Sequence, residues 1–201
     1  MRQKLMCVAL LCLVGLTPAV RAELVGWWKL DEGTGTTVQD STGKGNTGTF
    51  QDAPVWVAGK MGGALKFDGT NDWVDCGSGA SVMGNSTITA TCWIYPNVTS
   101  GQRALVSLGN TYTFKCGDTN LRFTTPGIRD HTSTNLTLLA GVWQHVAITF
   151  QPNTTGGAVF YLNGVEASRV ASTGINAAVG PFRIANTSFA GQFFNGVIDD
   201  V

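Results

Sequence analysis

Short runs of alternating apolar and polar residues recur along the chain, separated by Gly, Asn, Asp and Pro. Alternation with a period of two is typical of β-strands, and no segment after residue 22 keeps a helical period over three turns. The pattern predicts strands over residues 24–30, 64–68, 73–76, 87–95, 104–108, 111–115, 121–124, 143–150, 158–162, 165–170, 182–185 and 194–201. Many strands without helices indicate an all-β sandwich of two antiparallel sheets.

The strongest local signal is a predicted hairpin near the middle of this series. Asn163 and Gly164 separate the predicted strands 158–162 and 165–170. Asn and Gly adopt positive φ angles more readily than other residues, as a type I′ turn requires. The preceding strand, 143–150, has one strongly apolar face and one mixed face that carries His145. It is therefore expected to lie in a sheet with one face in the core and the other partly in water.

The first 22 residues have the layout of a secretory signal peptide. Arg2 and Lys4 precede an apolar run over residues 5–16, and small residues lead to Ala22. The run is too short to span a bilayer, although an N-terminal anchor helix is an alternative. We expect cleavage after Ala22, a mature domain over residues 23–201 and a secreted, extracellular or cell-surface location. No later segment predicts membrane insertion.

Charge patterning argues against nucleic acid as a partner. The whole chain has 13 basic and 13 acidic residues, and signal cleavage removes Arg2, Lys4 and Arg21. The mature chain is thus slightly acidic and contains no cluster of Lys and Arg of the kind that binds phosphates. Charged residues make up only 13% of the chain, which is common in secreted β-proteins that meet neutral partners.

Three cysteines remain after signal cleavage: Cys76, Cys92 and Cys116. In an oxidising compartment one disulfide is possible, with three alternative pairings and one thiol left over. Cys92 shares a predicted strand face with apolar residues, which favours a buried thiol. No CxxC spacing is present, so a zinc site built on thiolates is not expected.

Several segments resemble one family pattern in the right order. They are Leu24-Val25-Gly26-Trp27-Trp28, Asp40 to Thr49, Lys60 to Gly69 with Asp72-Trp73-Val74, the Trp143-x-His145-Val146-Ala147 strand with the Tyr161-x-Asn163-Gly164 hairpin, and Gly196-Val197-Ile198-Asp199-Asp200-Val201. Together they resemble the laminin G-like and pentraxin-like jelly rolls of the concanavalin A-like sandwiches. In that family the closing strand runs further, so the domain over residues 23–201 is expected to carry a truncated closing strand.

The resemblance implies a structural calcium ion that joins the first and last strands. Residue by residue, it points to Asp199, Asp40 and Asn46 as ligands, with Asp31 or its carbonyl as a further candidate. Calcium prefers hard oxygen donors from carboxylates, amides and backbone carbonyls. The alternative is that Asp31 and Asp40 cap turns and that Asp199 is a solvated charge at a sheet edge. Asp68 and Asp72 flank a turn and suggest a second site, which a β-turn explains equally well.

Catalytic patterns are missing from the sequence. Glucanases of this sandwich type need two carboxylates on one strand, but the three glutamates, Glu23, Glu32 and Glu166, lie far apart. No G-x-S-x-G elbow or phosphate-binding loop occurs. His145 is interpreted as a structural residue bonded to a neighbour, and His131 as a surface-loop residue.

We therefore expect a non-enzymatic binding module for carbohydrate or for an extracellular surface protein. An accessory domain of a larger extracellular enzyme, such as a glycoside hydrolase, and a structural adhesion domain are the alternatives. Most tryptophans are expected in the core, so no aromatic platform for a sugar emerges from the sequence. Loops at residues 99–103, 126–133 and 186–192 are candidate ligand-binding segments, because function on such scaffolds usually lies in loops.

Overall fold

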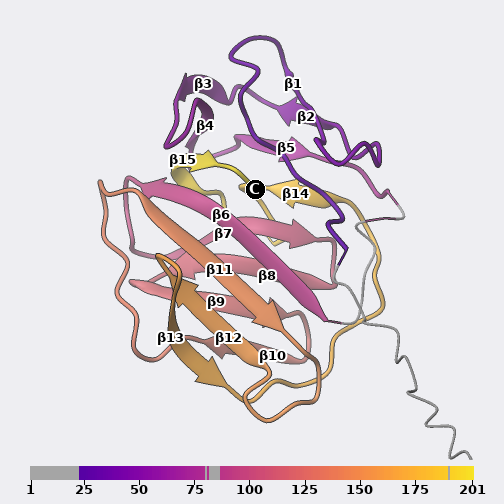
Figure 1. The fold of residues 1–201 in the computed structure, drawn as a ribbon, viewed down its shortest axis with the longest axis vertical. Coiled ribbons are helices and arrows are strands. Elements are labelled where there is room, and N and C mark those ends of the chain that lie inside the picture. Colours follow the sequence, from indigo (N-terminus) through magenta and orange to yellow (C-terminus); the bar gives the residue numbers. More distant parts are fainter. Residues whose placement is uncertain (1–22, 80, 82–86, 190) are drawn as a thin grey trace, which may run out of the picture.

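The chain forms two antiparallel β-sheets that face each other across a common core (Figure 1). This arrangement comes from a computed structural model that describes residues 23–79, 81, 87–189 and 191–201. The eight-stranded sheet has the order β1 (Thr37–Val38), β2 (Gly48–Gln51), β5 (Trp73–Asp75), β14 (Phe182–Ile184), β7 (Gln102–Leu108), β8 (Tyr112–Gly117), β9 (Asn120–Thr125), β10 (Arg129–Thr132). The seven-stranded sheet has the order β13 (Val165–Val170), β12 (Ala158–Leu162), β11 (Gln144–Phe150), β6 (Ile88–Pro96), β15 (Asn195–Asp199), β4 (Gly63–Asp68), β3 (Val55–Ala58). The predicted all-β jelly-roll sandwich is confirmed.

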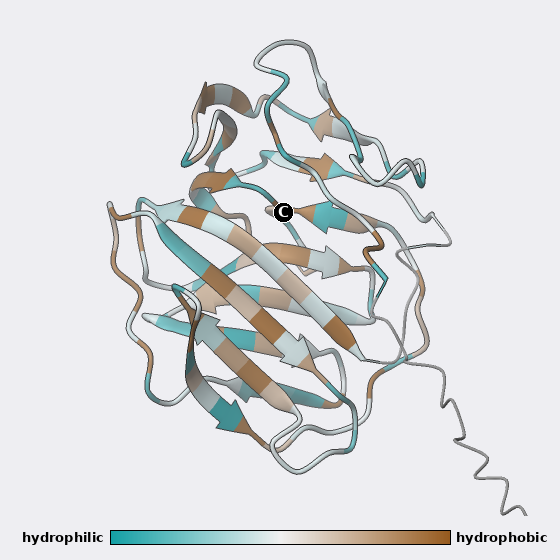
Figure 2. Ribbon diagram, viewed as in Figure 1, coloured by the Kyte–Doolittle hydropathy of each residue, from teal (hydrophilic) through white to brown (hydrophobic). Residues whose placement is uncertain are grey.

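Strand alternation builds the core. Along β6 and β11, apolar residues alternate with more polar ones, as the colouring of Figure 2 shows. The inward residues of the two sheets meet between them, and the largest fully buried side chains include Phe67, Phe114, Phe123, Phe150, Phe160 and Phe194. Phe123 of β9 stacks on Phe150 of β11 with ring centroids 4.5 Å apart. One aromatic contact thus joins the two sheets directly.

Most predicted strands are confirmed, and the hairpin is among the most accurate. β12 and β13 have the predicted bounds, and Asn163 and Gly164 have φ angles of 52° and 80°. The predicted strand over residues 24–30 is wrong: this segment makes a single bridge between Trp28 and Asp40. Backbone hydrogen bonds also join Trp28 to Val201 in both directions, so the segment is fixed by isolated contacts and not by a ladder. β1, β2, β3 and β10 were not predicted.

The interpretation of His131 as a surface-loop residue is wrong. His131 lies in β10, faces the core and is 1% exposed. Its Nδ1 lies 3.0 Å from the carbonyl oxygen of Phe123, and its Nε2 lies 3.2 Å from the backbone N–H of Thr173. Because the carbonyl can only accept and the N–H can only donate, the neutral Nδ1–H tautomer satisfies both contacts. The residues on both sides of His131 are polar, so the sequence alone does not indicate that its side chain is buried.

We expect the free energy of unfolding to fall as the pH drops below about 6.5, the ordinary histidine pKa. Burial lowers the pKa of His131, with the charge of Arg129 acting in the same direction. The unfolded chain therefore binds a proton that the folded chain resists, and stability is lost as the pH falls through the folded pKa. Urea titrations at pH 5 to 8 would measure this slope.

A matched pair of variants separates His131 from the other titrating groups. His131→Asn removes the titration and should flatten the pH dependence between pH 5 and 7. His145→Asn leaves His131 in place and should keep most of it, although burial also lowers the pKa of His145. An unchanged slope in the His131→Asn protein would contradict the assignment.

The three described cysteines, Cys76, Cys92 and Cys116, are free and buried. Burial raises the pKa of Cys116 to about 12, so its thiol stays protonated and unreactive. The buried state predicted for Cys92 is confirmed. The predicted signal peptide, residues 1–22, lies outside the described residues. Within the described residues, no helix is long and apolar enough to cross a membrane.

Candidate functional site

A depression of about 570 Å³ opens on the outer face of the seven-stranded sheet. It is lined by Lys60, Trp93, Trp143, His145, Asn163 and Gly164. The contributing segments come from four separate regions of the chain, which the order of the sheet brings together. Two indole rings, an imidazole, an ammonium and an amide therefore converge on one surface. Large aromatic area with a few placed polar groups is the usual make-up of a small-molecule site.

Strand register places the aromatic side chains of the depression. Trp93 of β6 pairs directly with His145 of β11, and both point away from the core because Cys92 and Val146 point into it. The two outward rings meet edge to face, with centroids 5.2 Å apart and an interplanar angle of 65°. Tyr95 and Trp143 form a second edge-to-face pair at 5.7 Å. Such pairs hold the rings in fixed orientations and so prepare a rigid aromatic surface.

The Asn-Gly turn closes one side of the depression. The Asn163 side-chain oxygen accepts a hydrogen bond from the His145 backbone N–H at 2.9 Å. In return, the Asn163 N–H donates to the His145 carbonyl at 2.8 Å. This reciprocal contact fixes the turn beside the imidazole.

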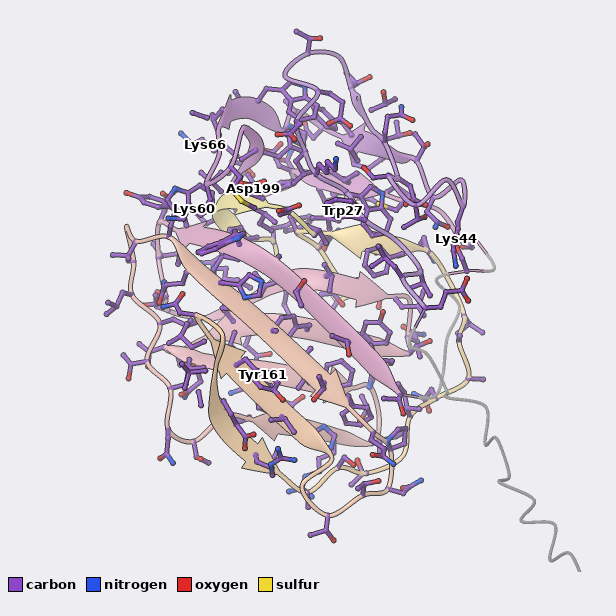
Figure 3. The ribbon with its side chains drawn as sticks, viewed as in Figure 1. Trp27, Lys44, Lys60, Lys66, Tyr161 and Asp199 are labelled. Atoms are coloured by element: carbon purple, nitrogen blue, oxygen red, sulfur yellow. The ribbon has the colours of Figure 1, made fainter. Side chains whose placement is uncertain are left out.

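Lys60 forms the opposite side, near Asp199 (Figure 3). Its ammonium nitrogen lies 5.1 Å from the centroid of the Trp93 ring, within the range of a cation–π contact. Its backbone N–H donates to Asp199 Oδ2 at 2.8 Å, and the Met61 N–H donates to the same oxygen at 3.0 Å. Asp199 thus holds the turn that carries Lys60 against the sheet.

His145 contributes a neutral imidazole. Burial lowers its pKa, and the negative charge of Asp200 opposes the shift only in part. A neutral imidazole has one donor and one acceptor nitrogen. Among the described residues neither ring nitrogen has a hydrogen-bond partner, unlike the structural role predicted for His145. The ring is therefore free to bond a ligand that offers both donors and acceptors.

Two of the four predicted calcium ligands, Asp40 and Asn46, bind each other. The Asn46 side-chain amide donates to Asp40 Oδ2 at 2.8 Å, and the Asn46 backbone N–H approaches the same oxygen at 3.2 Å. Asp40 Oδ1 accepts from the Thr42 N–H at 2.9 Å and from the Trp27 N–H at 3.2 Å. These bonds lower the pKa of Asp40 although burial acts to raise it. Asp40 therefore caps its own turn and ties it to the N-terminal segment.

The other two, Asp31 and Asp199, lie on either side of the turn at residues 59–63. Asp31 Oδ1 accepts from the Gly63 N–H at 2.7 Å. A Cβ at Gly59 would lie 2.7 Å from Asp199 Oδ2, and one at Gly62 would lie 2.3 Å from Asp31 Oδ1, so glycine permits both close approaches. In the described part of the chain, no three acidic, His or Cys side chains gather closely enough to hold a metal.

Asp199 is not the solvated edge charge of the alternative interpretation. It is fully buried, and burial raises its pKa, with the charges of Asp200 and Asp31 adding to the effect. Among the described residues, Asp199 Oδ1 is buried and has no hydrogen-bond partner. Asp200 has a φ of 54° and accepts a bond from the Trp27 indole N–H at 2.8 Å. The preference for Asp199 as the inward member of this pair is consistent with its burial.

The second predicted acidic site is a turn. Asp68 Oδ1 accepts from the Thr70 N–H at 2.7 Å and from the Asn71 N–H at 3.2 Å. Asp72 is 6% exposed and accepts from the backbone N–H of Ala53 at 3.0 Å. The Asp68 bonds are those of a turn, as the turn interpretation predicts, and Asp72 is held by the N–H groups of Asp68 and of the more distant Ala53.

The expectation that most tryptophans lie in the core is wrong. Only Trp28 is fully buried, where it stacks on Phe182 at 4.9 Å. Trp93 and Trp143 are partly exposed in the depression, and Trp73 is partly exposed against Arg183. The alternation along β6 indicates the exposure of Trp93, because it places Trp93 and Cys92 on opposite faces of one strand.

A sequence model of the family described as the concanavalin A-like lectin/glucanases superfamily matches residues 68–201. A search of curated proteins found no significant match. Among solved structures, domain 4 of AbnA, an extracellular GH43 arabinanase from Geobacillus stearothermophilus in complex with arabinotriose, is 19% identical. That alignment has a TM-score of 0.70 and covers 89% of this chain and 90% of the other.

Two further neighbours are larger proteins. The binding domain of Paraclostridial mosquitocidal protein 1 is 15% identical with a TM-score of 0.67, and the alignment covers 88% of this chain and 47% of that domain. A sialidase from Trypanosoma rangeli in complex with sialic acid is 13% identical with a TM-score of 0.61. That alignment covers 87% of this chain and 29% of the sialidase chain. The chain thus spans about half the toxin domain and less than a third of the sialidase. At these identities the likeness shows a shared fold.

Proposed function

Because the chain belongs to the laminin G-like branch of the concanavalin A-like lectin/glucanases superfamily, we propose that it is a non-catalytic binding module for carbohydrate. The observation that carries this proposal is the aromatic depression on the seven-stranded sheet. The ligands named for two structural neighbours, arabinotriose and sialic acid, support the same class of partner. We propose that the module acts outside the cell after removal of residues 1–22.

The chemistry of the depression suits a sugar better than a charged or wholly apolar ligand. The face of an indole ring is electron-rich, and it attracts the weakly positive C–H groups on the flat side of a sugar ring. The neutral imidazole of His145 can donate one hydrogen bond and accept another. The Lys60 ammonium and the exposed edge of the Asn163–Gly164 turn can bond further hydroxyls. The site can therefore bind both the C–H groups and the hydroxyl groups of a sugar ring.

An accessory role in a larger extracellular enzyme is compatible with the same site. The neighbour with 90% of its length aligned is itself one domain of a GH43 arabinanase. In such a role the module would hold the enzyme against its polymeric substrate. An adhesion domain that recognises a surface protein is the competing function, and binding experiments distinguish the two.

The test is a glycan array with the purified protein, followed by calorimetric titration of the best glycan. We expect dissociation constants in the micromolar to millimolar range, since the site is shallow and open to water. Free glycan should quench or shift the fluorescence of the depression tryptophans. No binding to any neutral or acidic glycan on the array would refute the carbohydrate proposal.

We also propose a structural calcium ion at Asp199 and Asp31. The buried oxygen of Asp199 that lacks a hydrogen-bond partner is the group that fits this role, because an unpaired buried carboxylate oxygen is costly. Calcium supplies positive charge and accepts several hard oxygen ligands at once. Asp40 and Asn46 fit less well, since the Asp40 oxygens accept hydrogen bonds from Thr42 and Asn46 and the Asn46 side-chain oxygen accepts one from Ser81.

Calcium should therefore raise the melting temperature, and chelation should lower it. At 100 times the dissociation constant the stabilisation is about 2.7 kcal/mol. Asp199→Asn should abolish the calcium response, whereas Asp40→Asn should lower the starting stability yet retain the response. Thermal melts of the wild-type protein and both variants, each in calcium and in chelator, measure these responses. A response lost in Asp40→Asn but retained in Asp199→Asn would contradict this location.

A further inference from the structure

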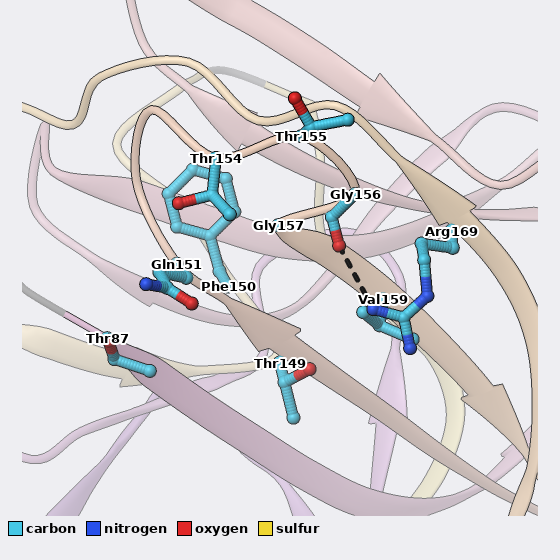
Figure 4. Close-up of a pocket in the computed structure, with 10 residues that line it drawn as sticks. All are labelled: Thr87, Thr149, Phe150, Gln151, Thr154, Thr155, Gly156, Gly157, Val159 and Arg169. Carbon is cyan, nitrogen blue, oxygen red and sulfur yellow. Dashed lines mark hydrogen bonds between the residues drawn. The ribbon is translucent and has the colours of Figure 1, made fainter.

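A second, smaller depression of about 200 Å³ lies on the same outer face, at the far end of β11 (Figure 4). Thr149, Val159 and Arg169 are cross-strand neighbours on this face, and Thr87, Gln151, Thr154 and Thr155 add further polar side chains to the lining. Arg169 lies at its edge and is already engaged by Glu166 at 2.7 Å and by the Gly156 carbonyl at 3.2 Å. The free polar groups that remain are hydroxyls and an amide.

An uncharged strip of the sheet connects this threonine depression to the aromatic one. Between His145 and Thr149 the outward residues are Thr91 of β6, Ala147 of β11 and Tyr161 of β12, which are register neighbours. Figure 3 shows Tyr161 further along the face from Lys60 and Asp199. Thr89, which pairs with Thr149, is exposed. Thr91 and Ala147 are small, and the partly exposed Tyr161 ring flanks them on β12, so a ligand can lie over the β6–β11 side of the strip.

Length and charge restrict what can occupy both depressions. At about 3.4 Å per residue, the step from His145 to Thr149 is roughly 14 Å, which no single monosaccharide spans. The strip residues Thr91, Ala147 and Tyr161 are uncharged, and the acidic neighbour of Tyr161, Glu166, is paired with Arg169 at 2.7 Å, so no unpaired charge on the described strip selects an ionic ligand. Threonine hydroxyls on alternate residues of β6 instead offer donors and acceptors at a regular spacing.

We propose that the outer face of the seven-stranded sheet binds one extended, neutral oligosaccharide across both depressions. One sugar unit stacks in the aromatic depression, and a unit further along the chain hydrogen-bonds in the threonine depression. The inference rests on the proposed carbohydrate function, and it adds that the ligand is an internal stretch of a polysaccharide and not a terminal sugar.

The test is a length series of the best array glycan, from monosaccharide to hexasaccharide, titrated against the wild-type protein and three variants. Thr91→Lys places a long side chain across the strip, and Gln151→Ala removes a polar group from the threonine depression. Thr37→Lys is the matched control, because Thr37 is exposed on β1 of the opposite sheet. Melting curves confirm that each variant folds.

For the wild-type protein and Thr37→Lys, affinity should increase about tenfold or more between the shortest and longest glycans. Thr91→Lys should remove most of this increase, Gln151→Ala should reduce it, and neither should alter binding of the shortest glycan. An affinity that stops increasing at one or two sugar units, with no effect of either variant, would overturn the two-depression proposal while leaving the carbohydrate function intact. No glycan binding at any length would overturn both.

Discussion

Replacing Trp93 with alanine is expected to weaken binding of the best glycan by about 30- to 100-fold. Buried aromatic anchors in binding sites contribute 2 kcal/mol or more when truncated, and each 1.4 kcal/mol is a factor of ten. Trp93 holds this position because its ring contacts both His145 at 5.2 Å and the Lys60 ammonium at 5.1 Å. Its loss removes the stacking surface and frees both neighbours. Calorimetry with the same glycan measures the change.

Trp73→Ala is the matched control for this prediction. Trp73 is also partly exposed, but it lies in β5 of the eight-stranded sheet, where its ring contacts the Arg183 guanidinium at 4.6 Å. The same substitution there should leave glycan affinity unchanged within about twofold. Equal losses in the two variants would show a general effect on the fold, and no loss in Trp93→Ala would move the ligand away from the aromatic depression.

The parts of the fold that could be predicted from sequence are those fixed by local chemistry. The Asn163–Gly164 turn needs two positive φ angles, which its two residues adopt at little cost, and the flanking strands follow from alternation. The prediction of a strand over residues 24–30 is wrong for the converse reason. Its apolar residues look like a strand, but Trp28 reaches its main partners, Asp40 and Val201, through isolated bonds.

The candidate site could not be predicted in the same way, because it depends on register between distant segments. Trp93 of β6 and His145 of β11 lie on adjacent strands, Asn163 follows β12, and Lys60 lies in the turn between β3 and β4 that Asp199 of β15 holds. These residues meet only because the sheet has the order β12, β11, β6, β15, β4, β3. Sequence alternation shows that Trp93 and Cys92 face opposite ways and that the apolar Cys92 face is the core, yet it does not show which residues of other strands lie beside Trp93. His131 illustrates the same limit. Its neighbours in the sequence are polar, yet its side chain is buried in the core.

The same dependence on packing between distant strands determines which core substitution should cost most. We expect Phe123→Ala to lower the free energy of unfolding by about 3–5 kcal/mol, the range for buried aromatic truncations. Phe123 is fully buried and contacts Phe150 at 4.5 Å and Tyr112 at 5.3 Å, so its removal opens a cavity between the sheets. A domain of this size loses about 2–4 °C of melting temperature per kcal/mol, which predicts a decrease of roughly 6–20 °C.

Phe189→Ala is the control of identical chemistry, because Phe189 is 40% exposed. It should change the unfolding free energy by no more than about 0.5 kcal/mol. Urea titrations of both variants give the two values, and an unchanged slope with denaturant would show that the substitutions act on the folded state. Because Phe123 of β9 and Phe150 of β11 join the two sheets, a loss below about 1 kcal/mol would mean that the sheets repack easily. The outer face that positions Trp93 and His145 would then be less rigid than the paired rings imply.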